Sequence, residues 1–329
     1  MKALIIGGGV AAEIHCKVLE ALNVTVFGIC DVRLAAAQAL AEKYNAKAFD
    51  DLSTALQEDI DFAVICTPSG THAKLAIQVM RAGKNVVVEK PLALNPWDCD
   101  AILQTAQQTG RLCAPISQLR FSPMYKKVKE CLDKQELGTL VMASLSMKYY
   151  RSREYYAGTW KGTKAMDGGE LMNQGIHGID IMCGLLGVPT SVSGKVATRY
   201  HEIEAEDTAV AHLTFPNGML GSIDSSTAVS KSKPRRFEIC GSDGLIVVEE
   251  DRITLAEGVM LEKEEFGEYR GSHDPKDIGL NLHSLIYQNI LSAMEGNAAL
   301  QYTAEDAANT VRVIYAIHES SETGKIIDL

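Results

Sequence analysis

MKALIIGGGVAAEIH, residues 1–15, joins a short apolar run to three glycines and then to a helical pattern. Because the glycines lie between a strand and a helix, the stretch fits G-x-G-x-x-G/A in the context that binds dinucleotides. The first glycine makes a tight turn, the second lets the backbone approach a pyrophosphate, and the following helix supplies amide donors. A plain turn between a strand and a helix is the alternative. The predicted cofactor contacts in this loop are Gly7, Gly9, Val10, Ala11 and Ala12.

Over the first 120 residues, short apolar strands alternate with helical patterns. The predicted strands are 3–6, 24–30, 62–67, 86–88 and 112–116, and the predicted helices are 11–22, 34–44, 71–82 and 96–108. Such alternation indicates a parallel sheet with helices on both faces. We therefore predict a dinucleotide-binding domain at 1–120.

After residue 120 the pattern changes to strands joined by turns. The predicted strands are 140–147, 191–198, 208–215, 219–225, 237–240 and 245–248, and the predicted helices are 122–132, 170–186, 282–294 and 304–323. Pro216-Asn217-Gly218 is a strong hairpin turn, and consecutive strands joined in this way indicate an antiparallel sheet. We predict an α/β protein with a second domain at 121–329, whose final helices can pack on either domain.

Composition and charge exclude several classes of function. The 329 residues carry 42 acidic and 32 basic side chains, and the net charge of −10 argues against a dedicated nucleic-acid-binding protein. No stretch approaches the ~18 apolar residues that a membrane span needs. The eight cysteines form no C-x-x-C pair and mostly lie in apolar runs, which predicts buried, reduced thiols and a cytoplasmic location.

Asp31 ends the second predicted strand, 22 residues after Gly9. A carboxylate there accepts hydrogen bonds from the adenosine ribose hydroxyls and repels a 2′-phosphate, which favours NAD over NADP. Arg33 is the opposing signal, because its side chain can reach toward a 2′-phosphate. As an alternative, Asp31 caps the helix that starts at Leu34.

Two further strands end in candidate groups, at the sheet edge where cofactors bind. The candidates are Thr67, Pro68 and His72 after one strand, and Glu89 and Lys90 after the next. A lysine between a glutamate and a proline is poorly placed for packing and well placed to face a nicotinamide. A solvated surface lysine is the alternative.

Asn173, His177 and Asp180 are spaced four and three residues apart, so on a helix they share one face. An amide, an imidazole and a carboxylate beside several glycines make an unusual core. A buried histidine supported by Asp180 is the alternative. We predict no metal site, because no other histidine or cysteine clusters nearby in the sequence.

Together these motifs resemble the Gfo/Idh/MocA oxidoreductases, which include glucose–fructose oxidoreductase and inositol dehydrogenase. The motifs concerned are Gly7 to Ala12 with His15, Thr67-Pro68 with His72, Glu89-Lys90-Pro91, and Gly168-Gly169 through His177 to Asp180. The resemblance implies an N-terminal Rossmann domain and a C-terminal α/β domain with a large, mostly antiparallel sheet. It also implies a homodimer or homotetramer assembled through that sheet.

The resemblance further implies hydride transfer between NAD(P) and a secondary hydroxyl of a sugar or polyol, with Lys90 and His177 in the active site. Asn173 stands where the inositol dehydrogenase type often has Asp, and an amide cannot take a proton. We therefore expect neutral His177 to act as the base, Lys90 to polarise the substrate oxygen and Asn173 to orient a neighbouring hydroxyl. Asn173→Asp should stay active, because it restores the commoner residue.

Gln118 and Arg120 match a region that lines the nicotinamide pocket, with structural packing as the alternative. Side chains just before the histidine motif can cradle a pyranose ring and an acid or phosphate group: Trp160, Lys161, Tyr149, Tyr150, Tyr155 and Tyr156. A strand end and a surface loop are the alternative. Three other functions remain open: an NAD-dependent glycosidase of the same fold, a non-catalytic NAD-binding regulator, and another reductase chemistry such as imine or tetrapyrrole reduction.

Overall fold

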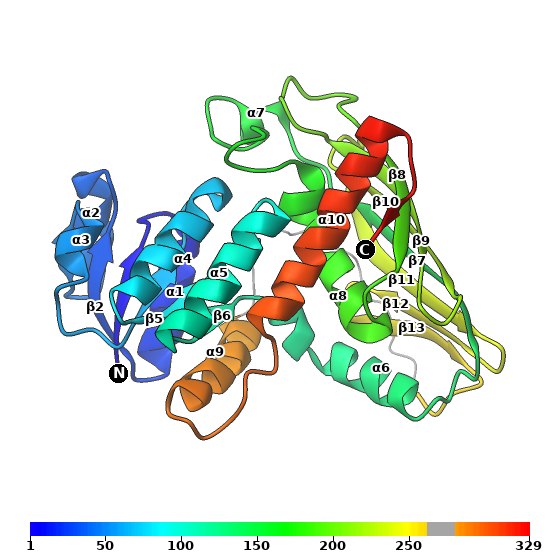
Figure 1. Ribbon diagram of the computed structural model, residues 1–329, viewed down its shortest axis with the longest axis horizontal. Helices are drawn as coiled ribbons and strands as arrows, with labels where there is room; N and C mark the ends of the chain where they lie inside the picture. The colour runs from blue at the N-terminus through cyan, green and yellow to red at the C-terminus, as the bar shows by residue number, and fades with distance from the viewer. Residues whose placement is uncertain (262–279) are drawn as a thin grey trace. The chain divides into compact units, whose positions relative to one another are not determined.

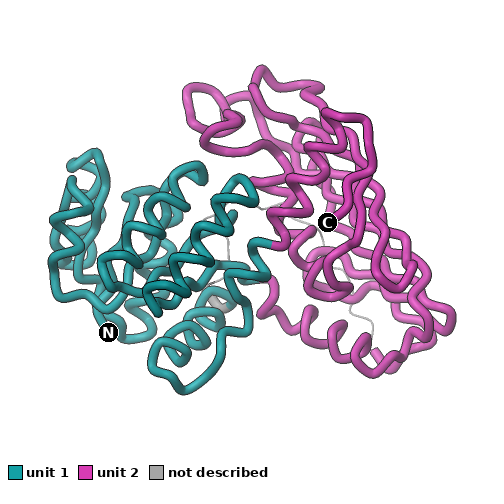
Figure 2. Tube along the Cα trace, in the orientation of Figure 1, with its two compact units in different colours: residues 1–118, 272–308 teal, residues 119–271, 309–329 magenta. Residues whose placement is uncertain are grey.

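A computed structural model describes residues 1–261 and 280–329. The chain divides into two compact units (Figure 2). Unit 1 holds residues 1–118 with the described part of 272–308, and unit 2 holds the described part of 119–271 with 309–329. The first division therefore falls after Gln118, and a late segment of the chain returns to unit 1.

Unit 1 is built on a six-stranded parallel sheet with the order β3-β2-β1-β4-β5-β6 (Figure 1). Its strands are β1 (Lys2–Ile6), β2 (Thr25–Cys30), β3 (Lys47–Phe49), β4 (Phe62–Ile65), β5 (Asn85–Val88) and β6 (Cys113–Pro115). The strand order reverses between β1 and β4, which is the doubly wound arrangement. Ligands bind beyond the carboxyl ends of the strands at such a reversal.

Unit 1 contains six α-helices among the described residues, and α5 has a capping residue at each end. They are α1 (Val10–Ala21), α2 (Leu34–Lys43), α3 (Leu52–Ala55), α4 (His72–Arg81), α5 (Pro96–Thr109) and α9 (Leu280–Met294). At α5, the Asn95 side chain accepts a hydrogen bond from the Asp98 amide at 2.8 Å, and Gly110 ends the helix at φ +63°. Helix α9 packs against α1 although it lies near the end of the chain.

Unit 2 is built on an eight-stranded sheet with the order β13-β12-β11-β7-β10-β9-β8-β14. Its strands are β7 (Leu140–Lys148), β8 (Ser191–Ala197), β9 (Thr208–Thr214), β10 (Leu220–Ser226), β11 (Lys233–Gly241), β12 (Leu245–Glu249), β13 (Arg252–Glu257) and β14 (Ile327–Asp328). Neighbouring strands are antiparallel except β7 and β10, which are parallel. The predicted hairpin between β9 and β10 turns at Gly218, where φ is +81°.

Among the described residues, helices cover one face of this sheet and leave the other open. Those that contribute to unit 2 are α6 (Pro123–Asp133), α7 (Arg153–Tyr156), α8 (Ile176–Leu186) and α10 (Ala304–Thr323). A Cβ added at Gly178 would lie 2.6 Å from the Met147 sulfur, so α8 packs directly on β7. The Ser320 hydroxyl of α10 accepts a hydrogen bond from the Gly194 amide of β8. The exposed face carries Met142, Val210 and Leu220, which alternate along their strands with buried residues.

The structure confirms the predicted α/β class, with a parallel Rossmann sheet and a mostly antiparallel second sheet. The helix predicted at 170–186 was wrong in one respect: Leu171–Gly175 is a π-helical turn, and the α-helix α8 starts only at Ile176. The pattern also missed β3, β13 and β14, of which the first and last have only three and two residues. Such short strands are too brief for a two-residue period to be visible.

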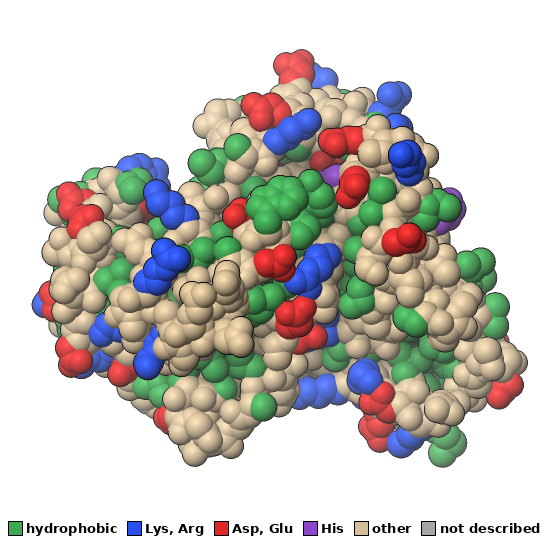
Figure 3. All heavy atoms as spheres, viewed as in Figure 1, with side chains coloured by type: hydrophobic (Ala, Val, Ile, Leu, Met, Phe, Trp, Pro, Cys, Tyr) green, Lys and Arg blue, Asp and Glu red, His purple; other side chains and the backbone are tan. Residues whose placement is uncertain are grey.

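Three features of the whole chain accompany this fold. All eight cysteines are free thiols, and burial raises the pKa of Cys16 and Cys113 to about 12. Within 1–261 and 280–329, no helix combines the length and apolar character that crossing a bilayer requires. On the face of each unit that Figure 3 shows, acidic and basic side chains are interspersed.

Candidate active site

The glycine loop after β1 leaves room for a phosphate group. Gly7 has φ +108°, and a Cβ there would lie 2.8 Å from the Cys66 carbonyl oxygen. At Gly9, by contrast, an added Cβ would meet nothing within 4 Å. Helix α1 starts at Val10, and no side chain caps its first amides. Free space beside uncapped helical amides fits the pyrophosphate of a dinucleotide.

Asp31 is fixed beside that loop by backbone amides. Its two carboxylate oxygens accept hydrogen bonds from Gly8 N and Arg33 N, each at 2.8 Å. The Arg33 side chain is 74% exposed, and its Nε lies 3.5 Å from the Asp31 carboxylate. A rigid carboxylate at the end of β2 has the geometry to accept ribose hydroxyls.

His72 ties together the two loops that follow β4 and β5. Its Nδ1 lies 2.7 Å from the Pro91 carbonyl oxygen, and its Nε2 lies 2.9 Å from the Thr67 carbonyl oxygen. The side chain is only 1% exposed, and burial lowers its pKa although the carbonyls oppose that shift. The structure therefore gives His72, predicted to bind the cofactor, the geometry of a positioning residue for the Thr67-Pro68 loop.

Glu89 is held in a buried network directly before Lys90. One carboxylate oxygen lies 2.8 Å from His15 Nε2, and the other accepts a hydrogen bond from Lys90 N at 3.0 Å. His15 Nδ1 contacts the Tyr287 hydroxyl of α9 at 2.8 Å. Burial alone would raise the pKa of Glu89, but the hydrogen bond and charge of His15 hold it well below its usual range. The network fixes the backbone that carries Lys90, which is partly exposed.

Asn173 belongs to the π-helical turn, and His177 to the first turn of α8. Asn173 Nδ2 donates to Asp167 Oδ1 at 2.5 Å, and Asn173 Oδ1 accepts from Gln174 Nε2 at 2.9 Å. Asp167 is 1% exposed and also accepts from Gly162 N at 2.7 Å. Asp167 is a further candidate site residue, which the sequence analysis did not single out. Its position directly before Gly168-Gly169 was the only available signal.

Asp180 forms a buried ion pair with Arg120. The two carboxylate oxygens accept hydrogen bonds from Arg120 Nε and Nη2 at 2.8 and 2.9 Å, and Thr310 donates to one of them at 3.0 Å. The Arg120 side chain is 10% exposed. This geometry is that of structural packing, the alternative given for Arg120, and its place in the substrate pocket stays a prediction.

Glu170 is a second buried carboxyl group, directly before the π-helical turn. Ser225 of β10 donates to its Oε1 at 2.5 Å, while Oε2 is buried and has no hydrogen-bond partner among the described residues. Burial, reinforced by the negative charge of Glu206, raises the pKa of Glu170 to about 8. Glu206 packs so closely that a Cβ at Gly169, where φ is +99°, would overlap its carboxylate. The sequence analysis did not single out this pair.

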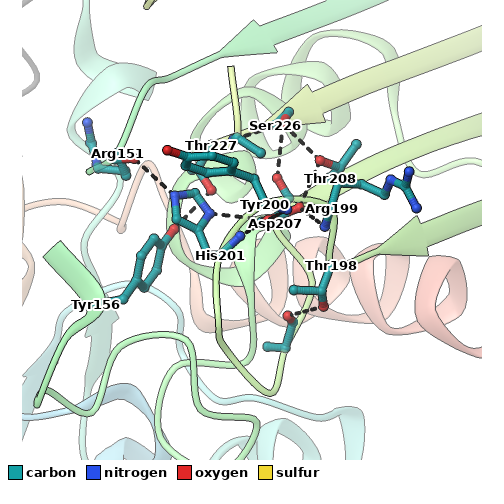
Figure 4. A network of polar contacts seen from close by, with 12 residues as sticks. Arg151, Tyr156, Thr198, Arg199, Tyr200, His201, Asp207, Thr208, Ser226 and Thr227 are labelled. Carbon is teal, nitrogen blue, oxygen red and sulfur yellow. Dashed lines mark hydrogen bonds and ion pairs between the residues drawn. The ribbon is translucent and has the colours of Figure 1, made fainter. Parts of the chain in front are cut away.

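Asp207 is the centre of a polar network that links residues 199–201 to residues 151–156 (Figure 4). The fully buried Asp207 carboxylate accepts from the amides of Arg199, Tyr200 and His201. Burial opposes its ionisation, but these amides bring its pKa below the usual value. The His201 ring lies against Tyr156, with centroids 4.6 Å apart, and its Nε2 contacts the Arg151 carbonyl oxygen at 3.0 Å.

Two predicted site residues remain. Gln118 is 8% exposed and ends unit 1. Trp160 is 36% exposed and lies in a loop whose turn is closed by a hydrogen bond from the Thr163 hydroxyl to the Trp160 carbonyl oxygen at 2.7 Å. The candidates thus fall into two groups: Gly7 to Gln118 in unit 1 and Arg120 to Asp180 in unit 2.

Two family models together match about three quarters of the chain. Residues 1–116 match the family described as "Oxidoreductase family, NAD-binding Rossmann fold", and residues 125–247 match the "GFO/IDH/MocA C-terminal domain".

Individual relatives are distant in sequence. The scyllo-inositol 2-dehydrogenase (NADP(+)) IolW of Bacillus subtilis (strain 168) is 25% identical over 82% of this chain and 79% of its own. The D-glucoside 3-dehydrogenase of Escherichia coli (strain K12) is 24% identical over 100% of this chain and 97% of its own. The structure of the WlbA dehydrogenase from Bordetella pertussis, in complex with NADH and UDP-GlcNAcA, has a TM-score of 0.90 and 27% identity over 100% of this chain and 97% of that one.

Proposed function

The chain belongs to the Gfo/Idh/MocA family of NAD(P)-dependent oxidoreductases, and we propose that it oxidises a secondary hydroxyl of a sugar, polyol or sugar derivative. Bound NAD(P)⁺ would supply the hydride acceptor, so that the alcohol carbon would lose a hydride, its oxygen a proton, and a ketone and NAD(P)H would result. The reverse reaction reduces the ketone. Support comes from the relatives, which include an inositol dehydrogenase and a glucoside dehydrogenase.

The observation that supports this proposal is that each unit, taken by itself, holds a candidate group on a fixed backbone or beside a fixed amide. Lys90 follows β5, and its backbone amide is held by the Glu89 carboxylate. His177 lies four residues after Asn173, whose side-chain amide is held by Asp167. Neutral His177 takes the hydroxyl proton, and the Lys90 ammonium stabilises the negative charge that develops on oxygen. Asn173, held by Asp167, orients a neighbouring hydroxyl of the substrate.

We also propose that NAD is preferred over NADP. Both Asp31 oxygens are fixed by amides, so a 2′-phosphate would meet a carboxylate that cannot turn away. Asp31→Asn keeps the size of the side chain and removes its charge, while Arg33 remains beside it. The ratio of kcat/KM for NAD⁺ to that for NADP⁺ should fall at least tenfold in this variant. A wild-type enzyme that prefers NADP⁺ would contradict the assignment.

The experiment that tests the function is a substrate panel. Sugars, inositols, uronic acids and nucleotide sugars are incubated with the purified protein and NAD⁺ or NADP⁺, and NAD(P)H absorbance is followed. Lys90→Ala and His177→Ala are the controls for background reduction. Cleavage of aryl glycosides without net NADH would instead establish the glycosidase alternative, and the absence of turnover with the whole panel would contradict the proposal.

We further propose a homodimer or homotetramer that works in the cytoplasm. The open face of the unit 2 sheet carries exposed apolar side chains, which a second copy would cover. Eight free cysteines fit a reducing compartment.

A further inference from the structure

Two cationic side chains of unit 2 converge on one aromatic ring. Lys161 Nζ lies 3.7 Å from the centroid of the Tyr155 ring, and the Arg151 guanidinium carbon lies 5.2 Å from it. All three side chains are partly exposed. Cations stack well on aromatic faces, but two on the same ring repel one another.

Neither cation forms an ion pair with a carboxylate in the part of the chain that the structure describes. Arg151 Nη2 donates to the Gln174 side-chain oxygen at 2.9 Å and Nη1 to the Tyr150 carbonyl oxygen at 3.2 Å, and both acceptors are neutral. Arg151 Nε is buried without a hydrogen-bond partner among those residues. A planar guanidinium with an unsatisfied donor is poised for an anion.

A carboxylate that attracts Lys161 is already engaged by other groups. Asp167 attracts Lys161, but its two oxygens accept from Gly162 N and Asn173 Nδ2. Burial is the main reason that the pKa of Lys161 lies below its usual value, and the charge of Arg151 adds to this shift. Two cations facing one committed carboxylate leave a surplus of one positive charge.

This cation pair is continuous with the proposed hydroxyl-binding group. Gln174 accepts from Arg151 through its oxygen and donates to Asn173 through its nitrogen. A ligand held by Arg151 and Lys161 therefore lies one side chain away from Asn173. All of these residues belong to unit 2.

We propose that the substrate is an acidic sugar, and that Arg151 and Lys161 bind a carboxylate on its ring. The inference rests on the proposed function for its redox chemistry. A single carboxylate matches the surplus of one positive charge, whereas a phosphate monoester brings nearly two negative charges. Loss of a charge-assisted hydrogen bond of this kind should weaken binding about 10- to 100-fold.

The test uses matched pairs that differ only in a carboxylate replacing CH₂OH: D-glucuronate and D-glucose, D-galacturonate and D-galactose, UDP-glucuronate and UDP-glucose. Binding to the protein with NADH is measured by calorimetry, and kcat/KM is measured with NAD⁺. In at least one pair the acid should bind about 10- to 100-fold more tightly. Lys161→Met should remove most of this advantage without weakening the neutral sugar, and Lys161→Arg should retain it.

Lys164→Met, in an exposed lysine of the same loop, is the matched control and should leave the advantage unchanged. Equal binding of acid and neutral sugars in all pairs would overturn the inference, even if neutral sugars are oxidised and the proposed function stands. Tighter binding of glucose 6-phosphate than of glucuronate would identify a phosphate site and also overturn it. Acid binding that depends on Lys161, without turnover of any sugar, would support this site and contradict the proposed function.

Discussion

Asn173 donates its side-chain amide to Asp167, with Nδ2 2.5 Å from Oδ1. A carboxylate is therefore present beside Asn173 although the sequence position itself carries an amide. Asp167 is almost fully buried, and its second oxygen accepts from the Gly162 amide. The negative charge that the resemblance places four residues before the histidine is supplied in this chain from the preceding loop.

This contact reverses the expectation for Asn173→Asp. The resemblance alone favours an active variant. The new carboxylate, however, would face the Asp167 oxygen where Asn173 now presents an N–H donor. Two such groups cannot both ionise cheaply, so activity at neutral pH should fall about 10- to 100-fold and Tm should drop. The swap Asp167→Asn with Asn173→Asp restores one donor and one carboxylate, and it should recover much of both. Wild-type activity and Tm in the single variant would contradict this reading of the contact.

The space beside Gly9 makes a clean test of dinucleotide binding possible. An added side chain there meets no protein atom within 4 Å, so Gly9→Val should fold with nearly unchanged Tm. The valine would occupy the space proposed for the pyrophosphate, and NADH affinity should fall at least 100-fold. Fluorescence titration with NADH measures the affinity. Gly8→Val is not equivalent, because a Cβ there would lie 2.9 Å from the Ala36 carbonyl oxygen.

Much of unit 1 could be predicted because most of its strands and helices show a clear apolar pattern, and some begin at capping residues such as Asn95; the short β3 and α3 were missed. The site could be predicted only in part. Lys90 and His177 stand in motifs, but the contact between Asn173 and Asp167 depends on how a loop closes. The π-helical turn at Leu171–Gly175 also escapes prediction, since one shifted hydrogen bond leaves no periodic trace.

The ion pair between Arg120 and Asp180 is a contact that sequence spacing did not reveal. Spacing alone grouped Asp180 with Asn173 and His177, because residues three and four apart share a helical face. Both Asp180 oxygens bind the Arg120 guanidinium, at 2.8 and 2.9 Å. Sequence spacing identifies which residues share a helix, but tertiary packing decides which neighbour each one binds.

The open face of the unit 2 sheet should be the subunit interface. Met142 and Leu220 are register partners on adjacent strands, and their exposed fractions are 48% and 60%. Leu220→Glu places a charge beside Met142 on this face and should dissociate the oligomer, with Tm lowered. Light scattering at micromolar concentration measures the mass. A wild-type monomer, or an oligomer that Leu220→Glu leaves intact, would refute the interface.

Glu170 should make stability depend on pH. Its folded-state pKa is raised to about 8, above the usual value for an unfolded glutamate, so the folded state binds more protons between about pH 4.5 and 8. The free energy of unfolding therefore falls as pH rises through that window, because Glu170 ionises more readily in the unfolded state. Glu170→Gln does not titrate, so its Tm relative to wild type should rise from pH 5 to pH 8. The corresponding gain in the free energy of unfolding is up to a few kcal/mol, at about 1.4 kcal/mol per pKa unit. A pH-independent Tm difference would contradict a protonated Glu170.

The proton-transfer role of His177 predicts a specific change in the pH profile. A base must be unprotonated, so oxidation should decline on the acidic side as the imidazole gains a proton. His177→Ala should lower kcat by about 10²- to 10⁴-fold and abolish that acid limb, whereas Asn173→Ala should lower activity and keep the limb.

Lys90→Ala should also lower kcat by about 10²- to 10⁴-fold, with NADH affinity close to wild type. If its ammonium serves the same substrate oxygen, removing it should shift the limb to higher pH, because a neighbouring cation disfavours the imidazolium. Steady-state kcat measured across pH 5 to 9 for the four proteins decides the assignment. An acid limb that persists in His177→Ala would assign the titrating group to another residue.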